Sequence, residues 1–372
     1  MQFYVTLTMN CNMQCRYCYG KCVDDFGKPF PLDVDDSLPT DIIYDVSDLS
    51  TFLMRDTNPV IIFYGGEPTL AIDLIQEIMD NVQTKAYMMQ TNGLLLDQLD
   101  SKYLKKFNTL LVSLDGDEIL TDYQRGEGTY KRVINNLKFI RSQGFQGELI
   151  ARMTVTPKTN IRQAVNWLLF NNDFPFESVH WQLDAQFWQS DYNRDSIRHW
   201  FEEYNKNIVD LVEDWISYMK VTRKVLRVYP FIALIESFLT GEPAKLRCGA
   251  GWNSFNVQTD GKITPCPVLA GIKPFIIGDI WETDPKMLYG SFSFNEPCTS
   301  CSIFELCGGR CLYAKATKLW GTEGFFLVCR TVKNLVNSLK TKVPIISQML
   351  SSGWLSINEF NYPKYNSCEI IP

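Results

Sequence analysis

Short apolar segments with the composition of β-strands recur through the first half of the chain, and stretches with helical spacing separate them. The expected strands are rich in β-branched and aromatic residues and cover residues 3–8, 60–64, 86–91, 110–114, 149–154 and 178–183. Between them, residues 70–82, 130–142 and 161–170 place apolar side chains three and four positions apart, as helices on a sheet do. This alternation predicts an α/β fold with a parallel sheet.

The pattern changes in the second half of the chain. Helical spacing continues over residues 197–219 and 231–239, whereas turns, glycines and cysteines dominate beyond residue 245. We therefore expect a core domain over residues 1–240 and a smaller cysteine-rich domain over residues 241–372 that includes a C-terminal helix. The core domain is expected to be a partial (β/α)6 barrel.

Composition and charge narrow the functional classes. The chain has 372 residues, of which 45% are hydrophobic and 21% charged, as in a soluble globular protein. The net charge of −6 argues against a nucleic acid or an anionic membrane as the main partner. Because neither a signal peptide nor an apolar run long enough to span a membrane occurs, we expect a cytoplasmic protein.

Cysteine is the residue type that points to specific chemistry. The chain has 12 cysteines and 2 histidines, and a reducing cytosol does not normally keep structural disulfides. Metal ligation by thiolates is therefore the favoured role. The cysteines fall into a group at residues 11–22 and a group at residues 248–329, with Cys368 near the end. We expect two metal-binding regions on either side of a cysteine-free body.

Cys11, Cys15 and Cys18 follow the first expected strand directly. Three thiolates on one loop suit a four-iron cluster that keeps one iron open for a small molecule, whereas a structural zinc site would take Cys22 as a fourth ligand. The spacing, with Tyr17 before the last cysteine, resembles the radical S-adenosylmethionine (radical SAM) family. The resemblance implies that these cysteines hold the catalytic 4Fe–4S cluster, with Tyr17 beside the cofactor S-adenosyl-L-methionine.

A second motif that resembles the family follows the second expected strand and reads Gly65-Gly66-Glu67-Pro68. Glycines let main-chain groups approach a ligand closely, and a carboxylate accepts charge-assisted hydrogen bonds from an ammonium group. The resemblance implies that Gly65, Gly66 and Glu67 bind the cofactor, with Glu67 on the ammonium of its methionine part. Gly-Gly pairs also occur in ordinary turns, so the position after the strand carries the inference.

Polar residues at the ends of the later strands also resemble the family. Asn92 follows the third strand, Ser113 and Asp115 end the fourth, and Arg152 lies on the fifth. Such positions face the mouth of an α/β barrel, where ligands bind. The resemblance implies that Asn92, Ser113 and Asp115 serve the ribose and that Arg152 holds the methionine carboxylate. An Asn-Gly turn, an Asp-Gly turn and a surface arginine are the alternatives.

The second group of cysteines forms a longer and more specific pattern. It reads Cys248-x12-Gly261-x4-Cys266, then Cys298-x2-Cys301-x5-Cys307-x3-Cys311, then Cys329. This pattern resembles the SPASM extension of radical SAM enzymes. The resemblance implies two auxiliary 4Fe–4S clusters, hence three clusters in all, with the ligand sets Cys298, Cys301, Cys307 and Cys329, and Cys248, Cys266 and Cys311. One zinc site with Cys298, Cys301, Cys307 and Cys311 would leave three cysteines unexplained.

Seven rear cysteines are one fewer than two fully ligated four-iron clusters need. The cluster of Cys248, Cys266 and Cys311 is therefore expected to have either an open iron or a ligand from Cys22 or Cys368. An open iron would bind a substrate thiolate and favour thioether chemistry. Closure by Cys368 would favour a carbon–carbon link, epimerisation or simple oxidation.

The resemblance implies an enzyme that generates a 5′-deoxyadenosyl radical. This radical would abstract hydrogen from a ribosomally made peptide and lead to a thioether or carbon–carbon crosslink, with an electron donor such as ferredoxin or flavodoxin as partner. Sulfatase-maturing relatives, which oxidise a Cys or Ser side chain, are the alternative. They carry an acidic residue after the cysteine that corresponds to Cys266, whereas this chain has Pro267.

A non-enzymatic zinc or iron–sulfur protein is the alternative from another class. It would explain residues 298–311 but gives no reason for the Gly-Gly-Glu-Pro motif. Residues at the end of the sixth expected strand are candidates to face a substrate, or they form an ordinary wet rim; these are Trp181, Asp184, Gln186 and Trp188.

Overall fold

A parallel β-sheet forms the core of the part of the chain that carries the first cysteine motif. The computed structural model describes residues 1–19 and 30–363, and the chain divides into two compact units. Unit 1 consists of Met1–Arg152 and Gly249–Ser293, and unit 2 of Met153–Cys248 and the chain from Phe294 onward. The expected domain boundary near residue 240 stays a prediction, since each unit combines residues from both sides of it.

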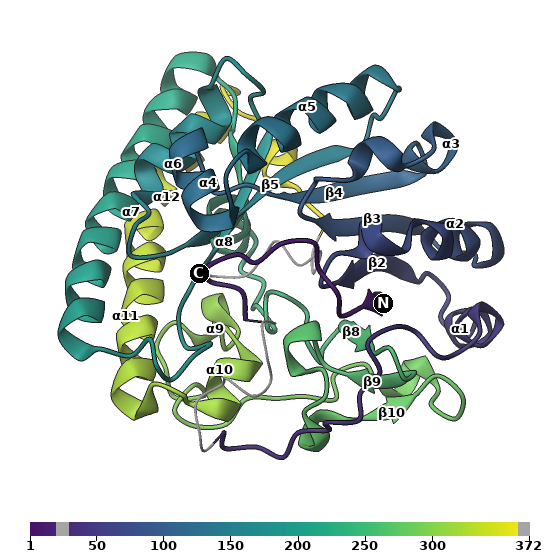
Figure 1. Ribbon diagram of the computed structural model, residues 1–372. Coiled ribbons are helices and arrows are strands. Elements are labelled where there is room, and N and C mark those ends of the chain that lie inside the picture. The colour runs from purple at the N-terminus through teal and green to yellow at the C-terminus, as the bar shows by residue number, and fades with distance from the viewer. Residues whose placement is uncertain (20–29, 364–372) are drawn as a thin grey trace. The chain divides into compact units, whose positions relative to one another are not determined.

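The strands of unit 1 lie side by side in the order β10-β9-β8-β1-β2-β3-β4-β5 (Figure 1). Strands β1 to β5 are parallel, β8 is parallel to β1, and β9 runs antiparallel to its neighbours β8 and β10. Their bounds are β1 Gln2–Thr8, β2 Val60–Gly65, β3 Ala86–Thr91, β4 Phe107–Ser113, β5 Glu148–Val155, β8 Ser254–Val257, β9 Lys262–Thr264 and β10 Gly278–Asp279. The expected parallel α/β fold is confirmed.

Strand β8 is a part of the sheet that the hydrophobic pattern does not reveal. It has four residues and comes from the cysteine-rich half of the chain, yet it pairs with β1 from Gln2↔Ser254 to Val5↔Val257. Every residue of β1 and β8 is buried, and the Thr6 hydroxyl donates a hydrogen bond of 2.7 Å to Asn256 Oδ1 between them. The cysteine-rich sequence therefore completes the core sheet.

Helices of unit 1 connect the parallel strands. They are α1 Val46–Leu53, α2 Ile72–Asn81, α3 Ser101–Leu104, α4 Glu118–Arg125 and α5 Thr129–Ser142. The apolar spacing predicts α2 and α5, but it does not predict α4, which is short and mostly polar. Helix α4 begins after Asp117, whose carboxylate caps it by accepting a hydrogen bond from Leu120 N–H, and it ends at Gly126.

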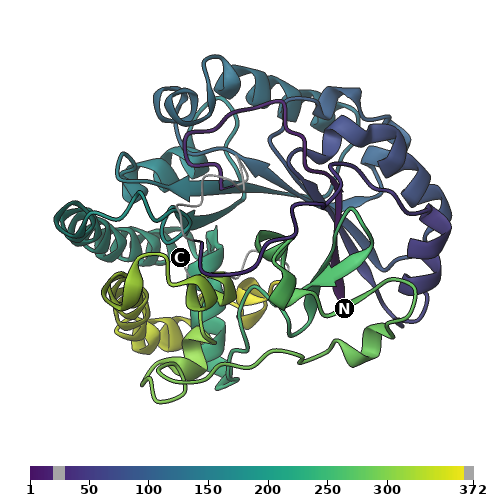
Figure 2. The same ribbon diagram turned by 60° about the horizontal axis from the view of Figure 1, so that its bottom comes forward.

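Unit 2 combines two parallel strands with a layer of longer helices. Its elements are β6 Ser178–Leu183, β7 Arg227–Val228, α6 Ile161–Phe170, α7 Arg194–Thr222, α8 Tyr229–Thr240, α9 Phe304–Cys307, α10 Leu312–Thr317, α11 Gly321–Lys340 and α12 Val343–Ser351. Helices α7 and α11 lie side by side in both views (Figures 1 and 2). Phe231 of α8 packs edge-to-face on Trp181 and Trp215 and anchors the core.

The helices of the described residues, 1–19 and 30–363, include none that is long and apolar enough to cross a membrane.

The cysteine-rich segment of unit 2 has two short helices before α11. Helix α9 has four residues and α10 has six. Helices of this length have little intrinsic stability. Their ordering therefore depends on surrounding contacts.

Candidate active site

The first cysteine loop follows the carboxyl end of β1 and packs on helix α4. Arg16 N–H donates to the Gln124 carbonyl (2.9 Å), and Arg16 Nε donates to the Tyr123 carbonyl (2.7 Å). The same guanidinium lies 4.4 Å from the centre of the Tyr123 ring. The helix thereby holds the main chain between Cys15 and Cys18.

Tyr17 extends this contact through a buried ion pair. Its hydroxyl donates to Asp115 Oδ2 at 2.8 Å, and Arg125 donates to both oxygens of the same carboxylate at 2.8 and 3.1 Å. Asp115 is fully buried and Arg125 is 7% exposed, so solvent screens this pair little. Desolvation raises the pKa of Tyr17 well above its usual range, and the tyrosine is therefore a hydrogen-bond donor at neutral pH.

The Glu67 carboxylate joins the ends of β2 and β3. Its Oε1 accepts hydrogen bonds from Thr69 N–H (3.0 Å), the Thr69 hydroxyl (2.6 Å) and the Thr91 hydroxyl (2.7 Å), and its Oε2 accepts one from Asn92 N–H (2.6 Å). Burial raises the pKa of Glu67, although these donors act in the opposite direction. Oε1 accepts three of these hydrogen bonds and Oε2 accepts one, so Oε2 is the oxygen with more room for a further donor.

The two glycines before Glu67 allow the end of β1 to approach β2. A side chain at Gly66 would place its Cβ 2.2 Å from the Asn10 carbonyl oxygen, and one at Gly65 would lie 2.3 Å from the Thr8 carbonyl oxygen. Because the two glycines have no side chain, the end of β1, which leads into the cysteine loop, can lie close to the end of β2. The glycines and the first cysteines are parts of one packed structure.

Asn92 links Glu67 to the cysteine loop. Its main-chain N–H binds Glu67, while its Nδ2 donates to Asn12 Oδ1 at 2.7 Å and lies 3.9 Å from Cys11 Sγ. The side-chain oxygen accepts a hydrogen bond from Leu94 N–H and so fixes the amide orientation. Cys11, Asn92 and Glu67 thus belong to a continuous polar network.

Ser113 ends β4 and Arg152 lies on β5, and the two residues are register partners in the sheet. The hydroxyl groups of Tyr19 and Tyr64 are hydrogen-bonded to each other. Burial raises the pKa of both tyrosines, and the positive charge of Arg152 opposes that increase. All the expected cofactor-binding residues therefore belong to unit 1 and lie on or near the carboxyl ends of β1 to β5.

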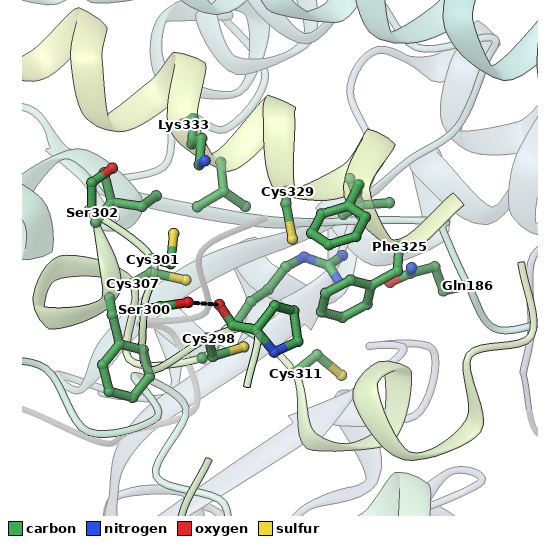
Figure 3. A pocket seen from close by; sticks show the side chains of 18 residues that line it. Gln186, Cys298, Ser300, Cys301, Ser302, Cys307, Cys311, Phe325, Cys329 and Lys333 are labelled. Atoms are coloured by element: carbon green, nitrogen blue, oxygen red, sulfur yellow. Dashed lines mark hydrogen bonds between the residues drawn. The ribbon is translucent and has the colours of Figure 1, made fainter. Parts of the chain in front are cut away.

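A second candidate site is a cavity of about 340 Å³ within unit 2, here called the rear cavity (Figure 3). Its wall combines cysteines with apolar and polar side chains, and the residues that matter for its chemistry are Cys298, Cys301, Cys307, Cys311, Cys329, Gln186, Arg310 and Lys333. Cys298 and Cys301 lie in one turn, Cys307 ends α9, and Cys329 lies on α11. Three separate segments thus bring their thiols to one cavity.

The rear cavity is suited to a group larger than a single metal ion. A space of about 10–15 Å³ already holds a water molecule, so this cavity is far larger than a mononuclear zinc site between touching ligands. Burial raises the pKa of Cys307 and raises that of Cys329 to about 11, while the nearby Arg310 charge acts in the opposite direction. A coordinated metal would deprotonate such thiols, so the donor set fits a thiolate-bound cluster.

Cys311 differs from the other rear cysteines in its direction and partners. Its sulfur points away from those of Cys301 and Cys329 (Figure 3), and it accepts a hydrogen bond from Ala314 N–H at the start of α10. Cys248 belongs to unit 2 and Cys266 to unit 1. The ligand set that joins Cys311 to these two cysteines stays a prediction. Cys22 and Cys368 lie outside the described residues, and so does the expected choice between an open iron and Cys368.

Comparisons with known sequences match the first part of the chain to a family. Residues 5–170 match the model of the Radical SAM superfamily. An uncharacterized protein of Archaeoglobus fulgidus is 26% identical over 84% of this chain and 75% of its own length. Fe-coproporphyrin III synthase of Methanosarcina barkeri is 31% identical over 42% of this chain and 37% of its own length. The antilisterial bacteriocin subtilosin biosynthesis protein AlbA of Bacillus subtilis is 20% identical over 82% of this chain and 65% of its own length.

Solved structures extend the similarity of fold to most of the chain. The structure of anSMEcpe with bound AdoMet and the Cp18Cys peptide has a TM-score of 0.70, with 19% identity, and covers 94% of this chain and 99% of that chain. Streptococcus suis SuiB bound to its precursor peptide SuiA has a TM-score of 0.52, with 18% identity, and the match covers 84% of this chain and 72% of that chain. The match to anSMEcpe covers nearly the whole chain, with its cysteine-rich C-terminal region, so the expected fold class is confirmed.

The fold and the site define a class of enzymes that hold a three-cysteine loop at the carboxyl edge of a parallel α/β sheet. Residues 5–170 are a radical SAM domain, and radical SAM enzymes use S-adenosylmethionine together with a 4Fe–4S cluster. The expectation of a radical SAM enzyme is therefore confirmed.

Several residues of the site are not found by sequence reasoning. Thr91 belongs to the site because its hydroxyl donates a hydrogen bond to Glu67. Its place directly before Asn92 in the sequence was a signal that could have identified it. Arg125, Tyr123 and Asn12 carry no signal in one sequence, since their roles depend on how α4 and the cysteine loop meet. Of the four candidates after the sixth strand, Gln186 lines the rear cavity.

Proposed function

We propose that Cys11, Cys15 and Cys18 hold the catalytic 4Fe–4S cluster and that S-adenosyl-L-methionine binds beside it. The observation that carries the proposal is the polar network that joins Cys11, Asn92 and Glu67 at the ends of β1 to β3. When bound, the cluster and cofactor supply a 5′-deoxyadenosyl radical that abstracts a hydrogen atom from the substrate. The protein supplies orientation and keeps water away from the radical.

The proposed cofactor contacts follow from the charges of these side chains. Glu67 Oε2 receives the ammonium of the methionine part, and Arg152 binds its carboxylate. Asn92 and Ser113 serve the ribose. Asp115 was expected to share that role, but its carboxylate already accepts hydrogen bonds from Tyr17 and Arg125. We therefore assign Asp115 to holding Tyr17, and its contact with the ribose stays a prediction.

The rear cysteines are proposed to bind two further clusters. Cys298, Cys301, Cys307 and Cys329, which line one cavity, form the first ligand set. Cys248, Cys266 and Cys311 form the second. Clusters held by these cysteines would provide an acceptor for the electron that product formation releases. None of the ten described cysteines forms a disulfide, in agreement with metal binding in a reducing cytoplasm, where ferredoxin or flavodoxin would supply electrons.

The proposed substrate is a ribosomally made peptide, and the product a thioether or carbon–carbon crosslink. Two structures that cover most of this chain, anSMEcpe and SuiB, contain a bound peptide. The Fe-coproporphyrin III synthase match covers only 42% of this chain, which limits what it says about the substrate. The similarities that extend over most of the chain therefore favour a peptide as the substrate.

Anaerobic purification and turnover test this proposal. We expect a brown protein with about twelve iron atoms per chain, as three four-iron clusters require, and formation of 5′-deoxyadenosine under reduction. Incubation with small peptides encoded near the gene should give a crosslinked product in tandem mass spectrometry. A colourless zinc protein without cofactor cleavage would contradict the enzyme proposal. An uncrosslinked product oxidised at a Cys or Ser side chain would support the sulfatase-maturase-like alternative instead.

A further inference from the structure

Gln186 and Arg310 form a polar pair in the wall of the rear cavity. Gln186 follows β6 and is 1% exposed, and Arg310 lies between Cys307 and Cys311. Arg310 Nη1 donates a hydrogen bond of 3.2 Å to Gln186 Oε1. The two residues come from distant parts of the sequence, and both line the cavity together with the cysteines.

Each member of the pair carries a buried donor that the described protein leaves unused. Arg310 Nε and Gln186 Nε2 are buried, and neither has a hydrogen-bond partner among residues 1–19 and 30–363. The amide group of Gln186 extends toward the cavity (Figure 3). Native proteins rarely leave buried donors unpaired, because such groups lose their hydrogen bonds to water without replacement. Two such donors beside one cavity indicate an acceptor that belongs inside it.

The backbone at both residues is held in an unfavourable conformation. The φ angles of Gln186 and Arg310 are 71° and 56°, in the left-handed region that non-glycine residues rarely adopt. The neighbour Gly309 also has a positive φ, 102°, and a Cβ there would lie 2.5 Å from the Phe294 ring. Strain of this kind persists only where surrounding contacts enforce it, and it is common at functional sites.

The charge of Arg310 lies beside the space that the cysteines surround. Arg310 lines the same cavity as Cys307 and Cys329, so its guanidinium lies close to the space that a cluster held by these cysteines would fill. Lys333 also lines the cavity, but its side chain is exposed to solvent. Water screens an exposed charge, whereas a buried donor acts at short range in a medium of low dielectric constant.

We propose that Arg310 and Gln186 are positioning residues that donate hydrogen bonds to sulfur atoms of a cluster held by Cys298, Cys301, Cys307 and Cys329 and thereby raise its reduction potential. This inference rests on the proposed function, since it requires a cluster in the rear cavity. Reduction adds negative charge to the cluster, and donors with a positive charge stabilise the reduced form more than the oxidised form. The pair makes this cluster a better electron acceptor than its cysteines alone would.

A redox titration followed by electron paramagnetic resonance tests the proposal. The starting protein is the full chain with Cys11, Cys15 and Cys18 changed to Ala, so that the front cluster does not contribute. In Arg310→Met, the ratio of reduced to oxidised cluster at a fixed applied potential should fall about tenfold, which equals about 59 mV for a one-electron couple. Gln186→Met should shift the ratio in the same direction by a smaller factor, and Arg310→Lys should lie between Arg310→Met and the starting protein.

Lys333→Met is the matched control, because it removes a positive charge from the same cavity but from its exposed side. Its ratio should stay within twofold of the starting protein. Full iron content with an unchanged potential in Arg310→Met would overturn the inference and leave the proposed function intact. Loss of rear iron already in the starting protein would contradict the proposed function itself. If Arg310→Met binds no cluster, Gln186→Met decides, since an unchanged potential in that variant would overturn the proposal.

Discussion

Glu67 has a structural duty in addition to its proposed role toward the cofactor. Its carboxylate accepts four hydrogen bonds from three residues, namely Thr69, Thr91 and Asn92, and thereby holds the ends of two strands together. The buried charge is stabilised by these donors before any ligand arrives. Substitutions at Glu67 must therefore be interpreted with a control that disturbs the network but keeps the charge.

Replacing Glu67 by Gln should weaken S-adenosylmethionine binding without loss of iron. The change removes a charge-assisted contact of about 1.5–3 kcal/mol, which corresponds to roughly 10- to 100-fold in affinity. Equilibrium binding measured by dialysis or calorimetry gives the dissociation constant. Thr69→Val is the control, because it removes the hydroxyl donor at 2.6 Å and leaves the carboxylate in place. Equal losses of affinity in both variants would contradict the proposed contact.

Cofactor affinity should also depend on pH through Glu67. Burial raises its pKa, so the folded protein keeps the carboxyl group protonated up to a higher pH than the unfolded chain does. Ionisation of Glu67 thus lowers apo-protein stability as pH rises through that pKa, whereas binding of an ammonium group requires the ionised form. Affinity of the wild type should fall as pH is lowered through the raised pKa, and Glu67→Gln should lack this dependence. A parallel pH profile in both proteins would contradict the assignment.

Single residues show where sequence reasoning succeeds and where it stops. The motif spacing predicts that Glu67 and Asn92 belong to one site, and their side chains and main chains meet there. It cannot predict that Asp115 binds Arg125, because nothing in one sequence tells which of 36 basic residues faces a buried carboxylate. Local motifs are therefore readable, whereas their supporting partners depend on tertiary packing.

At the scale of elements, helix α4 is the support of the cysteine loop. It provides the carbonyl groups of Tyr123 and Gln124 that bind Arg16, and it provides Arg125. Its eight residues carry too few apolar positions for a periodic signal, which is why the hydrophobic pattern does not predict it. The signals in the sequence that indicate this helix are the capping residue Asp117 before it and Gly126 after its last residue.

Arg125→Met should destabilise the protein and reduce occupancy of the front cluster. Removing one partner of a buried ion pair leaves the Asp115 charge uncompensated and costs about 3–5 kcal/mol. Urea denaturation of the apo-protein gives the stability change, and iron content gives the cluster change. Lys131→Met is the matched control, because its ion pair with Glu118 is exposed to solvent and adds little to stability. Similar small effects of both variants would show that α4 does not hold the loop through this pair.

At the scale of the whole molecule, the two units differ in how far the hydrophobic effect alone orders them. Strands β1 to β5 of unit 1 are largely buried, and the sequence predicts them within three residues at each end. The cysteine-rich segment of unit 2 alternates short helices with turns, so its order cannot be derived from apolar periodicity. Its geometry depends on long-range contacts and, by our proposal, on metal ligands.

Iron removal should therefore loosen one region selectively. After anaerobic chelation, amide hydrogen exchange in residues 294–318 should become faster, while exchange in β2 and β3 stays close to that of the iron-loaded protein. The reason is that thiolate–iron bonds replace an apolar core in the short-helix segment. Peptide-level mass spectrometry measures both regions in the same sample. Unchanged exchange in residues 294–318 would mean that packing alone orders the segment.

The pairing of β1 with β8 has a consequence for synthesis on the ribosome. One edge of β1 is completed by β2 early, but the other edge waits for Ser254–Val257. At about 5–20 residues per second, roughly 10–50 s pass before the second partner is made. During that interval the nascent chain presents an unpaired apolar strand edge, which is a template for aggregation. Chaperone protection of the emerging polypeptide is thus most needed before the cysteine-rich half has been translated.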